Sequence, residues 1–487
     1  MAEFTVAAAA QAMGGRIVAG DPQAAISGAA IDSRRLRGGE LFFAFAGQRT
    51  DGHRFVADAL TRGAAAAVVE RARGPFTAVL GGGPGAVIEV ESSLGALHDL
   101  ARSLRARLPR RLAAVTGSAG KTTTKELLAA MLACRFRVAR TPGNLNNAYG
   151  FPLSLLNLPE DAEWMVAEMG MSSPGELRQL SLLGRPDAAL FTVVRPVHLE
   201  FFASLREIAE AKSELLAGLA PDGLIVANAD DPEVYRIATM GAGAGGGRRV
   251  GEGPGRRRVL FSSHDHPEAA VRARDIAALS GGRIGSRFTL EAEGDRGGER
   301  QEMELPLLGR YNVENCLAAA AAAWAIGVPL PDIADAAREA QPAAMRGVVH
   351  RAPGGLTVID DSYNSNPDSL ARALESAAEL PAGRRLAVLG DMLELGPEAP
   401  RFHREAGEHA ARLGFAIVAG VGELAREIEI GAREAGAAET AWHPDAAAAA
   451  GWCEQTVEAG DLVLVKGSRR LGLETVVHRL LANGAPN

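Results

Sequence analysis

Short apolar runs and amphipathic stretches alternate along residues 109–342. The runs RRLAAVTG, WMVAEMG, DAALFTVV and GLIVANAD have the length and composition of buried strands, whereas KTTTKELLAAML and SLREIAEAKSELLAGL show helical spacing. Strands that alternate with helices are typical of a parallel sheet with helices on both faces. The pattern therefore predicts an α/β domain in this part of the chain.

The two flanking regions show related patterns. Residues 1–108 contain the strand-like runs GELFFAFAG and AAAAVVER and an amphipathic helix, SLGALHDLARSLRARLP, which Pro109 ends. Residues 343–487 contain the runs LTVIDDS, RLAVLGD, FAIVAGV and DLVLVKGS between helical stretches, as in a Rossmann-type domain. We therefore expect an α/β fold of three domains with mostly parallel sheets, divided at 1–108, 109–342 and 343–487.

The composition excludes several classes of protein. The 487 residues are 47% apolar and 23% charged, as in ordinary globular proteins, and the net charge of −7 argues against a nucleic-acid partner. The sequence shows neither a secretory signal nor an apolar run of the roughly eighteen residues that span a membrane. We therefore expect a cytoplasmic protein that is not inserted in a membrane.

The cysteines make neither a disulfide framework nor a metal-ligand spacing. Cys134, Cys316 and Cys453 are odd in number and far apart in the sequence. We expect three reduced, buried thiols, as is usual in the cytosol.

Residues 241–258 are rich in glycine and arginine and have too few apolar side chains to form a core. Composition favours a surface loop over a basic contact arm, although it does not exclude the arm.

The stretch AAVTGSAGKTTTKELL resembles a phosphate-binding loop, but Val115 stands where the common G-x-x-x-x-G-K-[ST] loop has its first glycine. Gly117 and Gly120 allow a tight turn between a strand and a helix, and helix N-termini favour anions. Lys121 supplies a positive charge for phosphates, and Thr122 supplies a hydroxyl for Mg²⁺. The context predicts a nucleotide-phosphate site.

Polar side chains follow the next predicted strands. Glu168 ends WMVAEMG, and His198 lies in RPVHLEFF. Ligands bind at the carboxyl ends of strands in open parallel sheets, so both residues are candidate Mg²⁺ ligands. A lone histidine is more often a hydrogen-bonded structural residue than a metal ligand. The helix pattern alone favours a solvated surface position for Lys212.

The motifs TGSAGKT, TPGNLNN, AEMG, HLEFF, AKSE and GRYNVENCLAA occur in this order. In this order they resemble the Mur ligase family, the ATP-dependent amide-forming ligases of peptidoglycan precursor synthesis. The short G-x-x-G-K-T loop is normal in that family, and the resemblance covers essentially the whole chain. It implies a UDP-sugar-binding domain at 1–108, a phosphate-loop ATPase domain at 109–342 and a Rossmann-like domain at 343–487.

The resemblance also implies roles for individual residues at the ATP site. Catalytic roles fall to Lys121, His198, Lys212 and Arg346, the last reaching the γ-phosphate when the domains close. ATP-binding residues are Thr116, Gly117, Ser118, Ala119, Gly120, Lys121, Thr122, Asn312, Asn315, Arg346 and Asp361. Two Mg²⁺ ions are implied, with the ligands Thr122, Glu168, His198 and Lys212, the lysine as a carbamate.

The segment DDSYNSNP resembles the branch of the family that adds D-alanyl-D-alanine to UDP-MurNAc-tripeptide. The sequences D-Y-A-H-T-P and D-N-P-R of the branch that adds the third residue are absent from the chain. Implied substrate-binding residues are Ser33, Arg34, Asp51, Gly52, His53, Asn144, Asn146, Asn147, Tyr363 and Asn364. The expected enzyme is a monomeric ligase that forms UDP-MurNAc-pentapeptide through an acyl phosphate. The third residue of the tripeptide, meso-diaminopimelate or lysine, stays open.

One departure and two alternatives remain. Many relatives have an asparagine in the strand before the HLE motif, where this chain has Thr192 and Val193. The folylpolyglutamate synthetase branch shares the phosphate loop, but it lacks the first domain and reads more like D-G-A-H-N-P in the last. A non-catalytic nucleotide switch would not need the four residues Glu168, His198, Lys212 and Arg346 together.

Overall fold

The computed structural model describes residues 4–47, 50–74, 76, 85–107, 110–143, 145–197, 199–240, 248–249, 255–294 and 297–483. Contacts divide the chain into two compact units. Unit 1 comprises Met1–Val115, Arg135–Ala189 and Glu214–Gly223, and unit 2 comprises Thr116–Cys134, Leu190–Ser213 and Leu224–Asn487.

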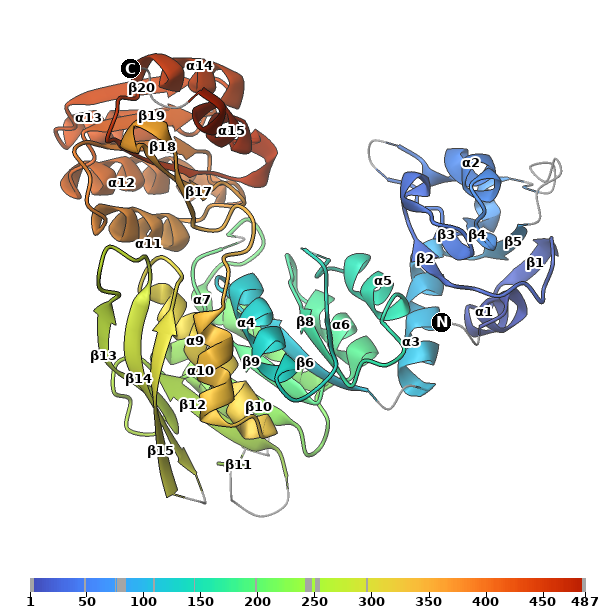
Figure 1. Cartoon of the computed structure of the whole chain (residues 1–487). Coiled ribbons are helices and arrows are strands. Elements are labelled where there is room, and N and C mark those ends of the chain that lie inside the picture. Colours follow the sequence, from blue (N-terminus) through green and yellow to red (C-terminus); the bar gives the residue numbers. More distant parts are fainter. Residues whose placement is uncertain are drawn as a thin grey trace. The chain divides into compact units, whose positions relative to one another are not determined.

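The N-terminal sheet belongs to unit 1. Its strands are β1 (Arg16–Ala19), β2 (Gly28–Ala30), β3 (Glu40–Phe43), β4 (Ala66–Glu70) and β5 (Ala86–Val90), with helices α1 (Val6–Ala12), α2 (Val56–Thr61) and α3 (Ser93–Arg107). In the described chain the order is β1-β5-β4-β3-β2, parallel except for β1 (Figure 1). The helix predicted before residue 108 is confirmed, since α3 buries leucines of its periodic stripe.

The middle of the chain forms a larger sheet. Its strands are β6 (Arg111–Thr116), β7 (Val138–Arg140), β8 (Trp164–Glu168), β9 (Ala188–Phe191), β10 (Leu224–Asn228), β11 (Arg248–Arg249), β12 (Arg257–Ser262), β13 (Val271–Ala278), β14 (Ser286–Gly294) and β15 (Gly297–Leu305). Helices here are α4 (Lys121–Ala133), α5 (Gly150–Leu156), α6 (Glu176–Gly184), α7 (Leu205–Ser213), α8 (Pro232–Met240), α9 (Tyr311–Ile326) and α10 (Leu330–Arg338). The strand order is β15-β14-β13-β12-β10-β9-β6-β8-β7, with β11 beside β12.

The antiparallel ribbon β13–β15 was not predicted from the sequence. Its strands pair antiparallel at one edge of the otherwise parallel sheet. Residues of β14 alternate between buried and more exposed positions, and most of β15 is exposed. Antiparallel strands tolerate one solvated face, and their many charged residues hide them from a search for apolar runs.

The C-terminal sheet belongs to unit 2. Its strands are β16 (Val348–Arg351), β17 (Thr357–Asp361), β18 (Arg385–Gly390), β19 (Ile417–Val421), β20 (Glu439–His443) and β21 (Leu462–Lys466). Its helices are α11 (Pro367–Ala378), α12 (Ala399–Arg412), α13 (Arg426–Glu434), α14 (Ala446–Thr456) and α15 (Glu474–Asn483). Within the described residues the order is β16-β17-β21-β18-β19-β20, and only β16 runs antiparallel.

Both faces of the C-terminal sheet are buried, which explains its continuous apolar strands. Ile359 and Leu464 pack in one core with α11, α12 and α13, and Val358 and Val465 pack in the opposite core with α14 and α15. The three sheets lie within 1–108, 109–342 and 343–487, and the boundaries themselves stay predictions.

Two expectations need correction. Cys134 is exposed, unlike the buried Cys316 and Cys453, because it follows the last residue of α4 at the helix surface. The glycine- and arginine-rich segment includes β11 and the start of β12, since β11 pairs in parallel with β12. The remainder, 241–247 and 250–254, lies outside the described residues. None of the described helices has the length and apolarity needed to cross a membrane.

Candidate active site

The predicted phosphate loop joins β6 to α4 through a left-handed turn. Gly117 has φ +154° and Gly120 has φ +80°, backbone conformations that residues other than glycine rarely adopt. A Cβ atom at Gly117 would overlap Thr192 Oγ1, and one at Gly120 would overlap Asn315 Oδ1. Lys121 Nζ donates to Gly117 O at 2.9 Å, which folds the lysine over the loop. The loop therefore has the backbone and the cation that a phosphate site needs.

A neighbouring segment holds the loop in place. Ser118 N–H donates to Val193 O at 2.7 Å, and the Ser118 hydroxyl accepts from Arg195 N–H at 2.9 Å. The Thr192 hydroxyl donates to Ala119 O at 2.6 Å. The departure at this position thus supplies a polar contact of its own, from a hydroxyl that binds the loop.

Two buried asparagines of α9 border the same loop. Asn315 Nδ2 donates to Asn312 Oδ1 at 2.9 Å, and Asn312 Nδ2 donates to Leu308 O at 2.8 Å. Since Asn315 lies against Gly120, the structure brings this predicted pair to the phosphate loop.

Lys212 is buried, so the surface position that the helix pattern alone favoured is wrong. Only 3% of the residue is exposed. Lys212 lies on the buried face of α7, together with Ile208 and Ala211. Within the described chain no hydrogen bond or ion pair of its ammonium is formed. Burial, and secondarily the charge of Lys121, hold the pKa of Lys212 well below its ordinary value. The spacing of Ile208 and Lys212, one helical turn apart, was the sequence feature that could have placed the lysine inside.

Glu168 lies at the end of β8, in register with Val115 of β6. Glu168 is 2% exposed, and Asn146 Nδ2 donates to Glu168 Oε1 at 2.7 Å. Asn146 therefore orients the candidate metal-binding carboxylate, a contact that the sequence did not predict. His198 and Asn144 lie outside the described residues.

The predicted residues of the C-terminal sheet gather at the end of β17. The Arg346 guanidinium stacks 4.0 Å from the centroid of the Tyr363 ring. Lys466 Nζ donates to Asp361 Oδ2 at 2.7 Å and to Asn364 O at 2.9 Å. Lys466, 3% exposed at the end of β21, is a site residue that sequence reasoning missed, because its partners lie about a hundred residues away.

The predicted UDP residues form tight turns in unit 1. His53 is buried, its Nδ1 binds Asp51 Oδ1 at 2.7 Å, and its Nε2 accepts from Glu70 N–H at 3.0 Å. A Cβ at Gly52 would approach Phe45 N to 2.8 Å. Asp51 and His53 therefore shape the loop, and both ring nitrogens of His53 are occupied.

Three further predicted substrate residues also lie in unit 1. Ser33 is buried, whereas Arg34 is exposed and its guanidinium binds Asp32 at 2.7 Å. Asn147 Oδ1 accepts from Gly150 N–H at 2.9 Å, at the start of α5. Their contact with a substrate stays a prediction.

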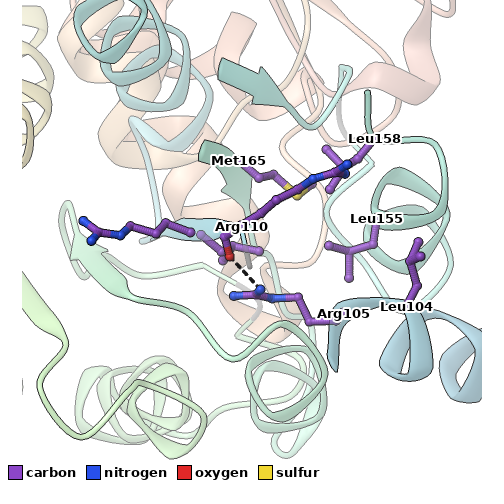
Figure 2. A pocket seen from close by; sticks show the side chains of 8 residues that line it. Leu104, Arg105, Arg110, Leu155, Leu158 and Met165 are labelled. Carbon is purple, nitrogen blue, oxygen red and sulfur yellow. Dashed lines mark hydrogen bonds between the residues drawn. The ribbon is translucent and has the colours of Figure 1, made fainter. Parts of the chain in front are cut away.

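A separate pocket lies where α3 meets β6 and β8 (Figure 2). Among the described residues, none of those predicted for the site lines it. Arg105 Nη1 donates to Arg110 O at 2.7 Å (Figure 2). Arg105 Nε donates to Gly184 O at 2.7 Å. These bonds occupy the guanidinium of Arg105, and Leu155 and Met165 form part of the apolar wall.

Family models match three consecutive regions of the chain. They describe a Mur ligase family catalytic domain at 25–105, a Mur ligase middle domain at 115–323 and a Mur ligase glutamate ligase domain at 345–469. The UDP-N-acetylmuramoyl-tripeptide--D-alanyl-D-alanine ligase of Bacillus subtilis (strain 168) is 34% identical over 469 residues, 94% of each chain.

Solved structures agree with this match. MurF from Acinetobacter baumannii superposes with a TM-score of 0.83 at 29% identity, over 98% of this chain and 99% of that one. A MurF ligase from Thermotoga maritima in complex with ADP gives 0.75 at 28% identity, over 94% and 97%. The fold and the phosphate loop define a nucleotide-binding α/β ligase of three domains. The chain belongs to the Mur ligase family.

Proposed function

We propose that this chain is an ATP-dependent ligase that adds D-alanyl-D-alanine to UDP-MurNAc-tripeptide. The observation that carries the proposal is the 34% identity to a ligase of this name over 94% of both chains. The segment DDSYNSNP, at which Asp361, Tyr363 and Asn364 gather, supports the same assignment.

The reaction has two steps. The terminal carboxylate of the tripeptide attacks the γ-phosphorus of ATP, and the bond to the β,γ-bridging oxygen breaks, giving an acyl phosphate and ADP. The amine of D-alanyl-D-alanine then attacks the acyl carbon, loses a proton, and inorganic phosphate leaves. In this scheme Lys121 and the N-terminus of α4 neutralise the phosphate charge, while Gly117 and Gly120 let the backbone approach it.

The residues present fit Mg²⁺ of the kind found at phosphate loops. The described residues contain no cluster of three His, Cys, Asp or Glu side chains that would hold a metal alone. Mg²⁺ needs few protein ligands, since phosphates and water complete its shell. Thr122, Glu168 and His198 would hold two such ions, which would neutralise charge on the triphosphate. Asn146 fixes the carboxylate of Glu168 for that purpose.

Lys212 would carry a carbamate. Burial lowers the pKa of Lys212 and so favours its neutral amine, which is the form that attacks CO₂. The new N–C bond and the loss of one proton convert the neutral amine into an anion; starting from the ammonium, two protons are lost. That anion would bind a metal ion without the repulsion of an ammonium group.

The remaining predicted contacts belong to the same proposal. Arg346 would stabilise the transferred phosphoryl group, Asp361 would bind the ribose, and Asn312 and Asn315 would border the adenine. The UDP-sugar would contact the residues Ser33, Arg34, Asp51, Gly52, His53, Asn144, Asn146 and Asn147. We also propose a monomer in the cytoplasm, where ATP is available and the three free thiols stay reduced.

Incubation of the purified chain with ATP, Mg²⁺, D-alanyl-D-alanine and UDP-MurNAc-tripeptide tests the proposal. Two tripeptides are used, one with meso-diaminopimelate and one with lysine, and mass spectrometry should detect the pentapeptide together with ADP and phosphate. Omission of either organic substrate should suppress ADP release. Transfer of a single amino acid to the dipeptide precursor, with D-alanyl-D-alanine ignored, would contradict the assignment within the family.

A further inference from the structure

Five charged side chains of unit 2 form a continuous network of alternating sign. Asp231, Arg195 and Asp368 are joined at 2.5 and 3.0 Å. Asp368 binds Arg372 at 3.2 Å, and Arg372 binds Glu314 at 3.1 Å. Asp368 and Arg372 belong to α11 of the C-terminal sheet, whereas the other three belong to the middle of the chain. The network therefore fastens α11 at two points.

The first point is the phosphate loop itself. The Arg195 backbone exchanges two hydrogen bonds with the hydroxyl of Ser118, at 2.9 and 3.1 Å. The Arg195 side chain then forks, with Nη1 on Asp231 and Nε on Asp368. A movement of the loop at Ser118 thus moves the residue that binds α11.

Asp231 makes this anchor rigid. Its side chain is 2% exposed, and its carboxylate accepts from Val194 N–H at 2.9 Å and from Val234 N–H at 3.0 Å, which caps α8. One arm of the Arg195 fork is therefore fixed, and the other arm is directed at Asp368.

The second point is the helix that borders the phosphate loop. Glu314 lies between Asn312 and Asn315 on α9. Burial lowers the pKa of Arg372, but the charges of Glu314 and Asp368 outweigh this effect, and the pKa is raised overall. Arg372 is therefore held as a cation between two acids.

The start of α11 is also coupled to the predicted C-terminal site residues. Asn366 caps the helix through a reciprocal pair of bonds with Ser369, directly after the segment from Asp361 to Asn364. A fixed first turn of α11 therefore fixes that segment. The five side chains are 2% to 28% exposed, so solvent screens them less than an ordinary surface pair.

We propose that Arg195 is a positioning residue, which holds α11, and with it Asp361 and the segment behind it, on the phosphate loop. This role rests on the proposed ligase function, because the placement of α11 and Asp361 on the phosphate loop would serve the ATP-dependent step. Arg195 acts through Asp368 and touches no reacting atom.

Steady-state kinetics of Asp368→Asn, Arg195→Gln and the double variant test the coupling. Each single variant should lower kcat about tenfold. The kcat of the double variant should be no lower than that of the less active single variant, because both substitutions remove the same contact between Arg195 and Asp368. Affinity for a fluorescent ADP analogue should change less than about twofold, since the loop keeps its own contacts. Asp368→Glu should recover most of the activity. Multiplied losses in the double variant, or a parallel loss of ADP affinity, would overturn the role.

Glu375→Gln is the matched control, because Glu375 also lies on α11 but pairs with His409 of the neighbouring helix α12. It should keep full activity. A loss of activity equal to that of Asp368→Asn would show that any loss of charge on α11 lowers activity, and it would contradict a specific role of the contact with Arg195. Asp368→Asn leaves the pair of Arg195 and Asp231 intact, so it keeps the test valid if Arg195→Gln fails to fold.

Small-angle scattering of the protein without substrates separates this inference from the proposed function. The double variant Asp368→Asn/Arg372→Gln should have a larger radius of gyration than the wild type and than Glu375→Gln, whatever substrate the enzyme uses. Equal radii would refute the network as the fastening, even if the pentapeptide is formed.

Discussion

The buried ammonium of Lys212 leads to opposite expectations for stability and for activity. Substitution of Lys212 by methionine keeps an unbranched side chain, one heavy atom shorter, and removes the charge. Because no described residue neutralises the ammonium, the folded state loses a desolvation cost, and Lys212→Met should stabilise the fold by roughly 1–3 kcal/mol near neutral pH. The same variant cannot form a carbamate, so ligase turnover should fall by at least about a thousandfold.

The pH dependence follows from the lowered pKa of Lys212. Between that folded pKa and the ordinary value of 10.5, the unfolded chain binds a proton that the folded chain does not bind. The stability of the wild type should therefore rise with pH in this window, by up to about 1.4 kcal/mol per pH unit from this one group. The variant lacks the slope, and its advantage should shrink as the pH approaches 10.5.

Urea unfolding at several pH values between neutrality and the ordinary lysine pKa measures the slope, in buffers freed of CO₂ to prevent carbamylation. A second measurement adds ¹³C-bicarbonate, and the wild type should show a carbamate carbon resonance that Lys212→Met lacks. Lys212→Arg is the control, because its guanidinium keeps the charge and cannot be carbamylated. It should be inactive and less stable than the wild type.

Equal pH slopes for the wild type and Lys212→Met would refute the reasoning, because the ammonium would then be solvated or paired in the folded protein. High activity in Lys212→Arg would exclude the carbamate and leave the lysine as a simple cation.

Three other substitutions test the phosphate loop. Lys121→Ala should abolish ATP turnover with little change in melting temperature, and near-normal turnover would remove the loop from the mechanism. Gly120→Ala should prevent binding of a fluorescent ADP analogue, because the new Cβ overlaps Asn315. The control is Gly436→Ala, which should only lower the free energy of unfolding by roughly 1–2 kcal/mol, since no atom lies within 4 Å of its new Cβ. Thr192→Val removes the hydrogen bond to the Ala119 carbonyl of the loop, so it should destabilise the fold by about 1–3 kcal/mol and weaken ADP binding. An unchanged ADP affinity in a calorimetric titration would show that the loop holds its shape without the hydroxyl.

Local patterns in the sequence determined the class of fold and the place of the phosphate loop. The apolar runs that became β6, β8, β17 and β18 are buried on both faces, so each is readable without knowledge of its neighbours. The loop is readable for a similar reason, because Gly117, Gly120 and Lys121 act within a few residues of one another. The motif order then indicated the family.

Tertiary structure alone decided which polar side chains are buried and what they contact. Lys212 belongs to a helix with many charged residues, and only the packing of α7 shows that its ammonium is removed from water. Arg195 contacts Asp368 across 173 positions, and Asn146 contacts Glu168 across a loop and a helix. A sequence pattern reports the period of one element, whereas such contacts depend on how elements distant in the chain are packed together.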